Sequence, residues 1–176
     1  MANIVLTGDT SGAITVAAPA VAGTNTITLP ASTGTLATTA TAGKILQVVS
    51  AVNSTFVTTT SSSFVDTGLT LNITPSATSS KILIIMSASI GNTSGGANTS
   101  AVIVRDSTEI ETFSRVAFNS SNHSDVQNSF VFLDTPSTTS ATTYKLQYKT
   151  DGGNARFNDN SVVDPASTIT LMEVAG

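Results

Sequence analysis

The residues of this sequence that could do acid–base or metal chemistry are few and far apart. Its single histidine, His123, lies in the polar segment Asn119–Ser124, and the sequence contains no cysteine. Zinc sites draw their ligands mainly from histidine, cysteine and carboxylate side chains, and no second histidine or cysteine is present to join His123. We therefore predict a histidine that is solvent-exposed or at a subunit contact, and no metal site around it.

Carboxylates offer the remaining chemistry. The segment Asp151–Asn160 supplies the hard oxygens that calcium prefers, but it lacks the spacing and terminal carboxylate of a helix–loop–helix calcium site. Glu109 and Glu111 share one face if their segment is a strand, and there they act more simply as a charged edge against aberrant strand pairing. The sequence thus predicts no enzyme, no catalytic residue and no cofactor, and it leaves open whether an ion occupies residues 151–160.

The composition excludes several classes of protein. Charged residues make up only 10% of the 176 residues, and the net charge is −4 with seven scattered basic residues. Ordinary soluble domains carry roughly 25% charged residues, so this chain suits a protein that is covered by neighbours in an assembly. Without a basic stripe for a phosphate backbone, we predict no nucleic-acid binding. With neither a signal-peptide pattern nor a run of about 20 apolar residues, we expect a soluble protein without membrane insertion.

Residues 1–41 are expected to form a short β stem. Three strand candidates, Asn3–Leu6, Ala13–Ala17 and Thr24–Leu29, are separated by turn-forming residues, and the small-residue segment Thr38–Gly43 follows them as a linker. Strands this short and alanine-rich cannot bury a face alone and usually bury it against copies of themselves. The apolar residues expected to attach the stem to its partner are Ile4, Val5, Leu6, Ile14, Val16, Ile27 and Leu29.

Residues 42–176 carry longer and more apolar strand candidates and are expected to fold as an independent knob. Clusters of glycine, asparagine and proline separate these candidates, which are Ile45–Val52, Leu69–Ile73, Ile82–Met86, Ala101–Arg105, Val126–Leu133, Tyr144–Lys149 and Ser167–Val174. Eight or so strands at this spacing predict an all-β fold, an antiparallel β-sandwich of the jelly-roll type. The predicted core residues are Leu69, Leu71, Ile73, Ile82, Ile84 and Met86.

Three details of the knob admit more than one interpretation. Ile82–Met86 is apolar on both faces, and because Leu83 and Ile85 lead into serines, we predict that these two residues make a subunit contact. Asp106–Phe118 fits either a helix or a strand, and the composition favours the strand. Phe56 and Val57 are expected to pair with Ile45–Val52.

Two resemblances add to this picture. Residues Gly12–Leu36 resemble the short linking segments of bacteriophage tail-fibre and virion-surface proteins, in which such strands intertwine as homotrimers. The final strand, Ile169–Val174, resembles the closing strand of the trimeric jelly rolls of the tumour-necrosis-factor and C1q type. Together the resemblances imply a homotrimer on the surface of a phage particle, made in the cytoplasm of the bacterial host.

Three functions remain open within this interpretation. As a capsid decoration protein (a cement protein or head fibre), the chain would dock on the shell through its stem, and the modest length favours this role. As a tail fibre or receptor-binding knob, it would join a tail protein and meet the host surface. As a carbohydrate-binding module, it would bind a host surface glycan, although Tyr144 and Tyr148 offer only a thin aromatic platform.

Overall fold

The computed structural model describes residues 3–7, 13–17, 44–118, 124–159 and 165–176. The chain divides into two compact units, Met1–Ala42 and Gly43–Gly176. The expected stem strand Thr24–Leu29, which contains Ile27 and Leu29, lies outside the described residues, as do His123 and Asn160.

The first unit contains one antiparallel strand pair among its described residues. Strand β1 (Asn3–Thr7) pairs with β2 (Ala13–Ala17), so that Ile4 lies opposite Val16 and Leu6 lies opposite Ile14. Both expected strands of this segment are therefore present, within a residue of their expected bounds.

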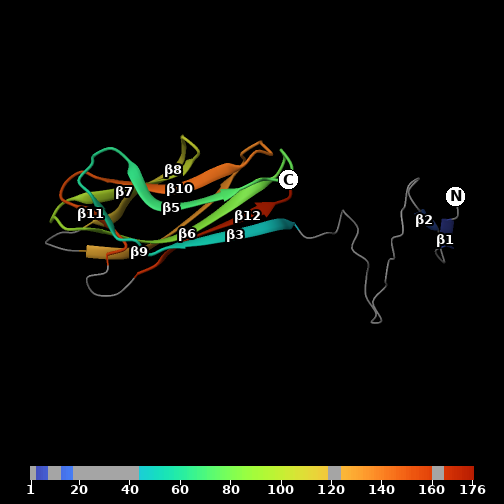
Figure 1. Ribbon diagram of the computed structural model, residues 1–176, viewed down its shortest axis with the longest axis horizontal. Coiled ribbons are helices and arrows are strands. Elements are labelled where there is room, and N and C mark those ends of the chain that lie inside the picture. The colour runs from blue at the N-terminus through green and yellow to red at the C-terminus, as the bar shows by residue number, and fades with distance from the viewer. Residues whose placement is uncertain (1–2, 8–12, 18–43, 119–123, 160–164) are drawn as a thin grey trace. The chain divides into compact units, whose positions relative to one another are not determined.

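The second unit is an all-β sandwich of two antiparallel sheets, as expected, and its described residues form no helix. One sheet has the order β5-β10-β7-β8, and the other has the order β3-β12-β6, with β9 on the free side of β6 (Figure 1). The strands are β3 (Ile45–Asn53), β5 (Val65–Ile73), β6 (Lys81–Asn92), β7 (Asn98–Arg105), β8 (Thr108–Phe118), β9 (Ser124–Asp134), β10 (Thr142–Thr150) and β12 (Ser167–Val174). Short strands β4 (Val57–Thr59) and β11 (Ala155–Phe157) extend the second sheet beside the end of β6.

The strand pairs of the sandwich are nested along the chain. Strand β7 pairs with β8, β6 with β9, β5 with β10, and β3 with β12, each pair enclosing the previous one in sequence. The chain therefore behaves as one long antiparallel hairpin that is rolled up until its two halves form the two sheets. One consequence is that all the strands start or stop at one of two ends, which we name by their residues. The proximal end holds Lys44, Lys81 and Val174, and the distal end holds Asn92, Asn98 and Thr150.

The core lies between the sheets and is built by alternation along the strands. Leu69, Ile73, Ile82, Ile84 and Met86 are buried there, whereas Leu71 is half-buried against its edge. The facing sheet contributes Tyr144, Leu146 and Tyr148, which alternate with outward polar residues of β10. Because side chains of a strand alternate between its faces, each strand gives one face to this core and one to the outside.

Local pairing differs from the sequence expectation in three places. Asp106–Phe118 is confirmed as a strand from Thr108 onward, after a turn with positive φ at Asp106. The expected pairing of Val57 with β3 is wrong, because β4 pairs with the short strand β11, which the sequence pattern did not reveal. Glu109 and Glu111 were expected on one face, but a bulge places them opposite Val104 and Ile103, two neighbours that point to opposite faces.

Candidate functional site

The outer face of the β3-β12-β6-β9 sheet is the most unusual surface of the knob. Residues directly opposite each other in an antiparallel pair share a face, so the registers define rows of side chains across the four strands. The first row is Val48, Met172, Leu83 and Leu133, the second is Ser50, Thr170, Ile85 and Val131, and the third is Val52, Thr168, Ser87 and Ser129. We call these residues the apolar face, and none of them is charged.

Large apolar side chains of this face are open to solvent in the single chain. Val52 is 68% exposed, Val131 is 58% exposed and Val48 is 54% exposed. At ordinary strand and row spacings, the three rows have a footprint of roughly 400 Å². An apolar patch of this size on a monomer is commonly a functional interaction surface.

Charged residues border the apolar face at both ends. Lys81 lies at the proximal end of β6, and at the distal end Arg156 and Asp125 flank Gly91 in one row of the sheet. A Cβ atom on Gly91 would lie 1.8 Å from the Asp125 carboxylate, so this row requires glycine. An apolar centre with a charged rim is the anatomy of a protein–protein interface.

The outer face of the β5-β10-β7-β8 sheet is polar. Its central row holds Lys145 and Gln147, which both contact Asp66: the Lys145 ammonium lies 2.9 Å from the carboxylate, and Gln147 donates to it at 2.7 Å. The Lys149 ammonium lies 4.4 Å from the centroid of the Phe64 ring. This face satisfies itself within one chain and needs no partner.

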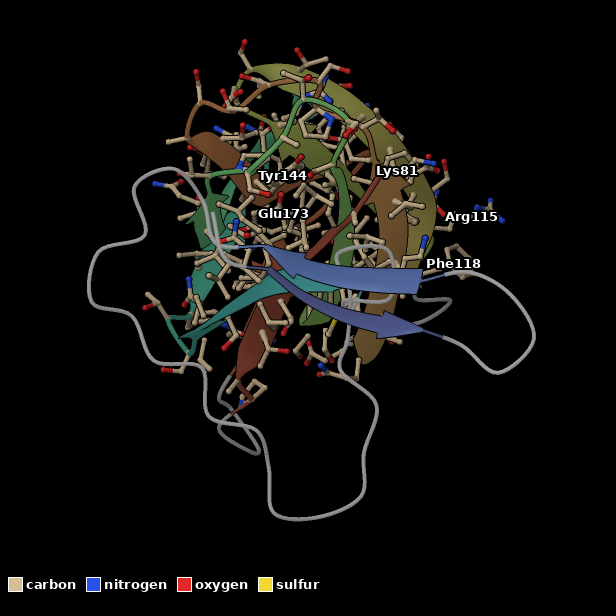
Figure 2. All side chains as sticks on the ribbon, turned by 90° about the vertical axis from the view of Figure 1, so that its right-hand side faces the viewer. Lys81, Arg115, Phe118, Tyr144 and Glu173 are labelled. Carbon is tan, nitrogen blue, oxygen red and sulfur yellow. The ribbon has the colours of Figure 1, made fainter. Side chains whose placement is uncertain are left out.

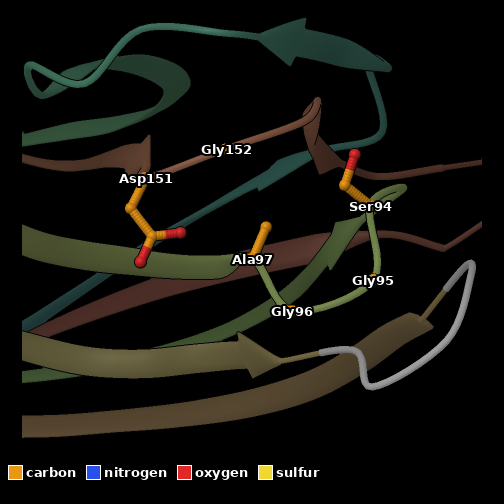
Figure 3. A pocket seen from close by; sticks show the side chains of 6 residues that line it. All are labelled: Ser94, Gly95, Gly96, Ala97, Asp151 and Gly152. Carbon is orange, nitrogen blue, oxygen red and sulfur yellow. The ribbon is translucent and has the colours of Figure 1, made fainter.

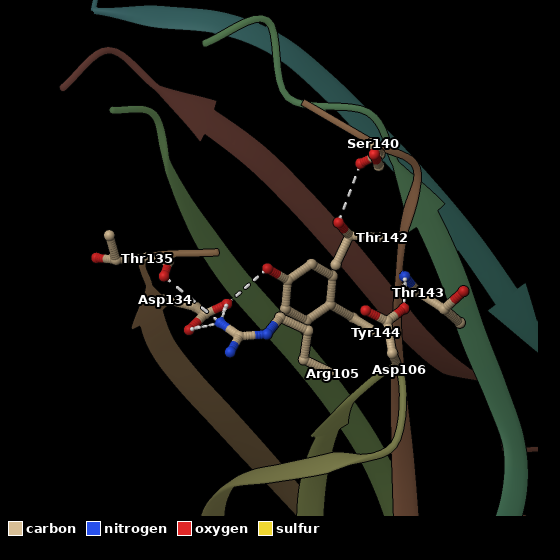
Figure 4. Close-up of polar contacts among 8 residues, drawn as sticks. All are labelled: Arg105, Asp106, Asp134, Thr135, Ser140, Thr142, Thr143 and Tyr144. Atoms are coloured by element: carbon tan, nitrogen blue, oxygen red, sulfur yellow. Dashed lines mark hydrogen bonds and ion pairs between the residues drawn. The ribbon is translucent and has the colours of Figure 1, made fainter. Parts of the chain in front are cut away.

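A buried ionic network ties the two sheets together at the proximal end (Figure 4). Both carboxylate oxygens of Asp134 on β9 accept hydrogen bonds of 2.8 Å from Arg105 on β7, and one of them also accepts a bond of 2.7 Å from the hydroxyl of Tyr144 on β10. Burial, followed by the bond to Asp134, raises the pKa of Tyr144 far above its ordinary value. The bond to Asp134 likewise raises the pKa of Arg105. The network is therefore a fixed structural crosslink between the sheets.

A second buried carboxylate, Glu173 on β12, lies at the same end (Figure 2). It accepts hydrogen bonds from the Gln47 amide at 2.6 Å and from the backbone N–H and hydroxyl of Ser76 at 2.7 and 2.6 Å. Burial alone would raise the pKa of Glu173, but these hydrogen bonds outweigh it and lower the pKa to about 2. Glu173 thereby fastens the β5–β6 connection over the proximal end of the core. Neither carboxylate was singled out from the sequence, where the only sign of Glu173 was an acidic residue at an inward position of an alternating strand.

The other residues predicted from the sequence are placed as follows. Leu83 and Ile85 lie half-buried in the centre of the apolar face. Ile4, Val5, Leu6, Ile14 and Val16 lie in the β1–β2 pair. Tyr144 and Tyr148 share one strand face, but both are buried, and burial raises the pKa of Tyr148 to about 12. They therefore cannot serve as an aromatic platform for a sugar, which corrects that expectation.

The acidic segment expected as a possible calcium loop splits between two different contacts. Asp151 accepts hydrogen bonds from Asn98, whereas Asp159 forms an ion pair with Arg156. Within the described part of the chain, no three histidine, cysteine, aspartate or glutamate residues gather in a way that could hold a metal ion. The described residues also include no helix long and apolar enough to cross a membrane.

Comparisons with known proteins give distant likenesses only. No family model and no curated protein matches this chain. Two solved structures of infectious bursal disease virus are similar to it: the Gx strain with 16% identity and a TM-score of 0.43, and the Gt strain with 19% identity and a TM-score of 0.38. Each match covers 97% of this chain but only 45% and 46%, respectively, of the matched chains, so this chain spans less than half of their length. Because both TM-scores are low, these likenesses establish neither a shared fold nor a shared function.

Proposed function

We propose that this chain is a non-enzymatic structural protein of a bacteriophage virion, a homotrimer with a jelly-roll knob and an N-terminal attachment stem. The apolar face is the observation that carries the assembly part of this proposal. The phage part rests on the resemblance of residues 12–36 to fibre linking segments. The shell or tail protein that it contacts is the partner of the stem.

The nested pairing of the strands supports the jelly-roll assignment. A jelly roll is an eight-stranded double sheet made from two Greek keys. The four nested pairs of this knob use eight strands, and the sheet orders β3-β12-β6-β9 and β5-β10-β7-β8 follow from rolling up one long hairpin. Strands β4 and β11 are a short addition at the distal end.

The chemistry of the apolar face supports a second copy of the chain as its occupant. Symmetric oligomers bring the same or adjoining surfaces of identical subunits together. A charged patch would then meet its own charge, whereas Leu83, Ile85 and Val131 can meet their counterparts without repulsion or desolvation of a charge. The β1–β2 pair provides a second motive, because an isolated two-stranded pair is at best marginally stable.

Multi-angle light scattering of the full chain tests the trimer directly. The expected mass is about three times 17.8 kDa, and a monomer at micromolar concentration would refute the proposed assembly. A chain that starts at Ala42 should remain folded by circular dichroism but fail to bind particles that lack the native protein. Normal binding of that shortened chain would overturn the assignment of residues 1–41 as the attachment segment.

Within the virion, we favour capsid decoration over a tail fibre, since adsorption fibres usually carry longer shafts. Electron microscopy of intact particles with a label on this protein separates the two roles. Label on the faces of the head supports a cement protein or head fibre. Label at the tail supports the alternative, an adsorption fibre or receptor-binding knob.

A further inference from the structure

The distal end of the knob carries an open pocket that the assembly role does not use. The pocket has a volume of about 410 Å³ and is lined by Ser94, Gly95, Gly96, Ala97, Asp151 and Gly152. Figure 3 shows the Ser94–Ala97 turn on one side and Asp151 with Gly152 on the other. Its volume falls within the range of small-molecule sites, and its small residues leave backbone groups open to a ligand.

A buried amide fixes the two turns that form this pocket. The side-chain N–H groups of Asn92 donate to the hydroxyls of Thr99 and Thr150 and to the carbonyl of Gly152 at 3.0, 2.9 and 3.2 Å. The oxygen of the same amide accepts from the backbone N–H of Ser94 at 2.9 Å. Asn92 is fully buried, so it joins one wall of the pocket to the other. A pocket that is held open in this way loses little free energy to ordering when a ligand binds.

One carboxylate is aimed and held at the edge of the pocket. Both oxygens of Asp151 accept hydrogen bonds of 2.6 Å from Asn98, one from its backbone N–H and one from its side-chain amide. The side chain of Asp151 is nevertheless exposed, and each oxygen keeps a further acceptor site. A ligand that donates hydrogen bonds, such as one with adjacent hydroxyl groups, would match this carboxylate.

An exposed aromatic ring stands in the same row. Asn98 lies between Asp151 on one side and Phe118 of β8 on the other. The Phe118 ring is 46% exposed, and the guanidinium carbon of Arg115 lies 5.4 Å from its centroid. Arg115 is a non-glycine residue with a positive φ of 57°, within an irregular stretch of β8 opposite β7. Figure 2 shows Phe118 and Arg115 at the periphery of the sandwich, away from the buried Tyr144.

We propose that this distal pocket is a saccharide-binding subsite, with Phe118 as the stacking platform and Asp151 as the acceptor of sugar hydroxyls. A sugar ring offers one face of C–H groups for an aromatic ring and an edge of hydroxyl donors for a carboxylate. A divalent cation would need further carboxylates, and Asp151 is the only acidic residue among those that line the pocket. The small side chains of the walls leave room for a bulky ring.

The proposal does not depend on the virion role or on the trimer. Because Asn92 and Asn98 both lie at the distal end, the pocket is about 30 Å along β6 from the proximal end where the chain enters the knob. It also opens away from the apolar face, since Asp151 and Phe118 belong to the other sheet. Sugar binding can therefore be measured on the assembled full-length protein.

The test is a titration of the full-length protein with galactose, glucose, mannose and N-acetylglucosamine, followed by amide NMR. At least one sugar should produce saturable shifts at the amides of Gly95, Gly96 and Gly152. The Phe118→Ala variant should weaken that binding at least about tenfold, whereas Phe56→Ala, which removes another exposed ring, should leave it unchanged. Asp151→Asn should weaken it too, with Asp66→Asn as the matched control on the same sheet.

Two results would overturn the inference. One is the absence of shifts at the pocket with all four sugars while the spectrum shows a folded protein. The other is binding that Phe118→Ala and Asp151→Asn leave intact in well-dispersed spectra. Light scattering on the same samples keeps the two proposals apart: a trimer without sugar binding contradicts only the subsite, and a monomer that binds sugar contradicts only the trimer.

Discussion

The two outer faces of the knob are made by the same kind of strand and yet carry opposite chemistry. On the β5-β10-β7-β8 sheet, the outward residues Asp66, Lys145 and Gln147 contact one another and project into solvent. On the β3-β12-β6-β9 sheet, the equivalent positions hold Leu83, Ile85 and Val131. Antiparallel sheets commonly have one face on the core and one in water, and only the first sheet follows that pattern.

The difference shows which surface has been left for a partner. A face that pairs its own charges gains little from association, because each pair would have to lose water again. A face of valine, leucine and isoleucine gains about 25 cal/mol for each Å² that a partner covers. The following predictions break or sharpen this contrast, in order of decreasing effect.

Ile84→Asp should unfold the knob. Ile84 is fully buried between the sheets, and an unpaired buried carboxylate costs several kcal/mol, which is a large part of the 5–15 kcal/mol that stabilises a typical domain. Circular dichroism should show loss of the β signal at room temperature. A folded Ile84→Asp protein would contradict the position of the core.

Ile85→Asp, one residue further along β6, should leave the β signal in place and convert the trimer to monomers. Its side chain points to the apolar face, where the new charge is solvated in a free chain and buried only in the assembly. Light scattering and circular dichroism on the same sample measure both effects. Thr70→Asp, an exposed outward position on the polar face, is the matched control and should remain a trimer. Trimeric Ile85→Asp would show that the apolar face is not the subunit contact.

Glu173→Gln should make the stability of the knob less sensitive to acid. The pKa of Glu173 is about 2 in the folded chain against an ordinary value of 4.5, so the ionised form favours the folded state. That stabilisation, roughly 2 kcal/mol, is complete above pH 4.5 and is lost as the pH falls towards 2. Urea unfolding at neutral pH and at about pH 3 measures the difference. The loss between these two pH values should be smaller in Glu173→Gln than in the unmodified chain, and Glu109→Gln, at an exposed position, should behave like the unmodified chain.

Asp66→Asn should have the smallest effect. The ion pair with Lys145 is exposed, and such pairs contribute about 1 kcal/mol or less. We expect an unchanged trimer and a midpoint of thermal unfolding within a few degrees of the unmodified chain. A large loss of stability would mean that the polar face is not self-sufficient.

Much of the fold was predictable from local pattern. The alternation in Leu69–Ile73 and the apolar run Ile82–Met86 identified strands and inward residues, because a period of two is a property of the strand itself. The pairing of Val57 with β11 and the bulge between Glu109 and Glu111 were not predictable. They depend on which distant strands meet and on one-residue shifts in register.

The functional surfaces divide in the same way. From the sequence alone, Leu83 and Ile85 were recognised as a second apolar face of β6, because two parities of one strand can be read side by side. Val48, Met172, Val131 and Leu133 join that face only through the registers of β3, β12 and β9, and Glu173 and Asp134 became buried anchors only when the sheets closed over them. The distal pocket likewise joins Ser94–Ala97 to Asp151 across more than 50 residues of sequence. Local periodicity is fixed by the backbone of each strand, whereas rows, pockets and buried charges are made by strands that lie far apart in the chain.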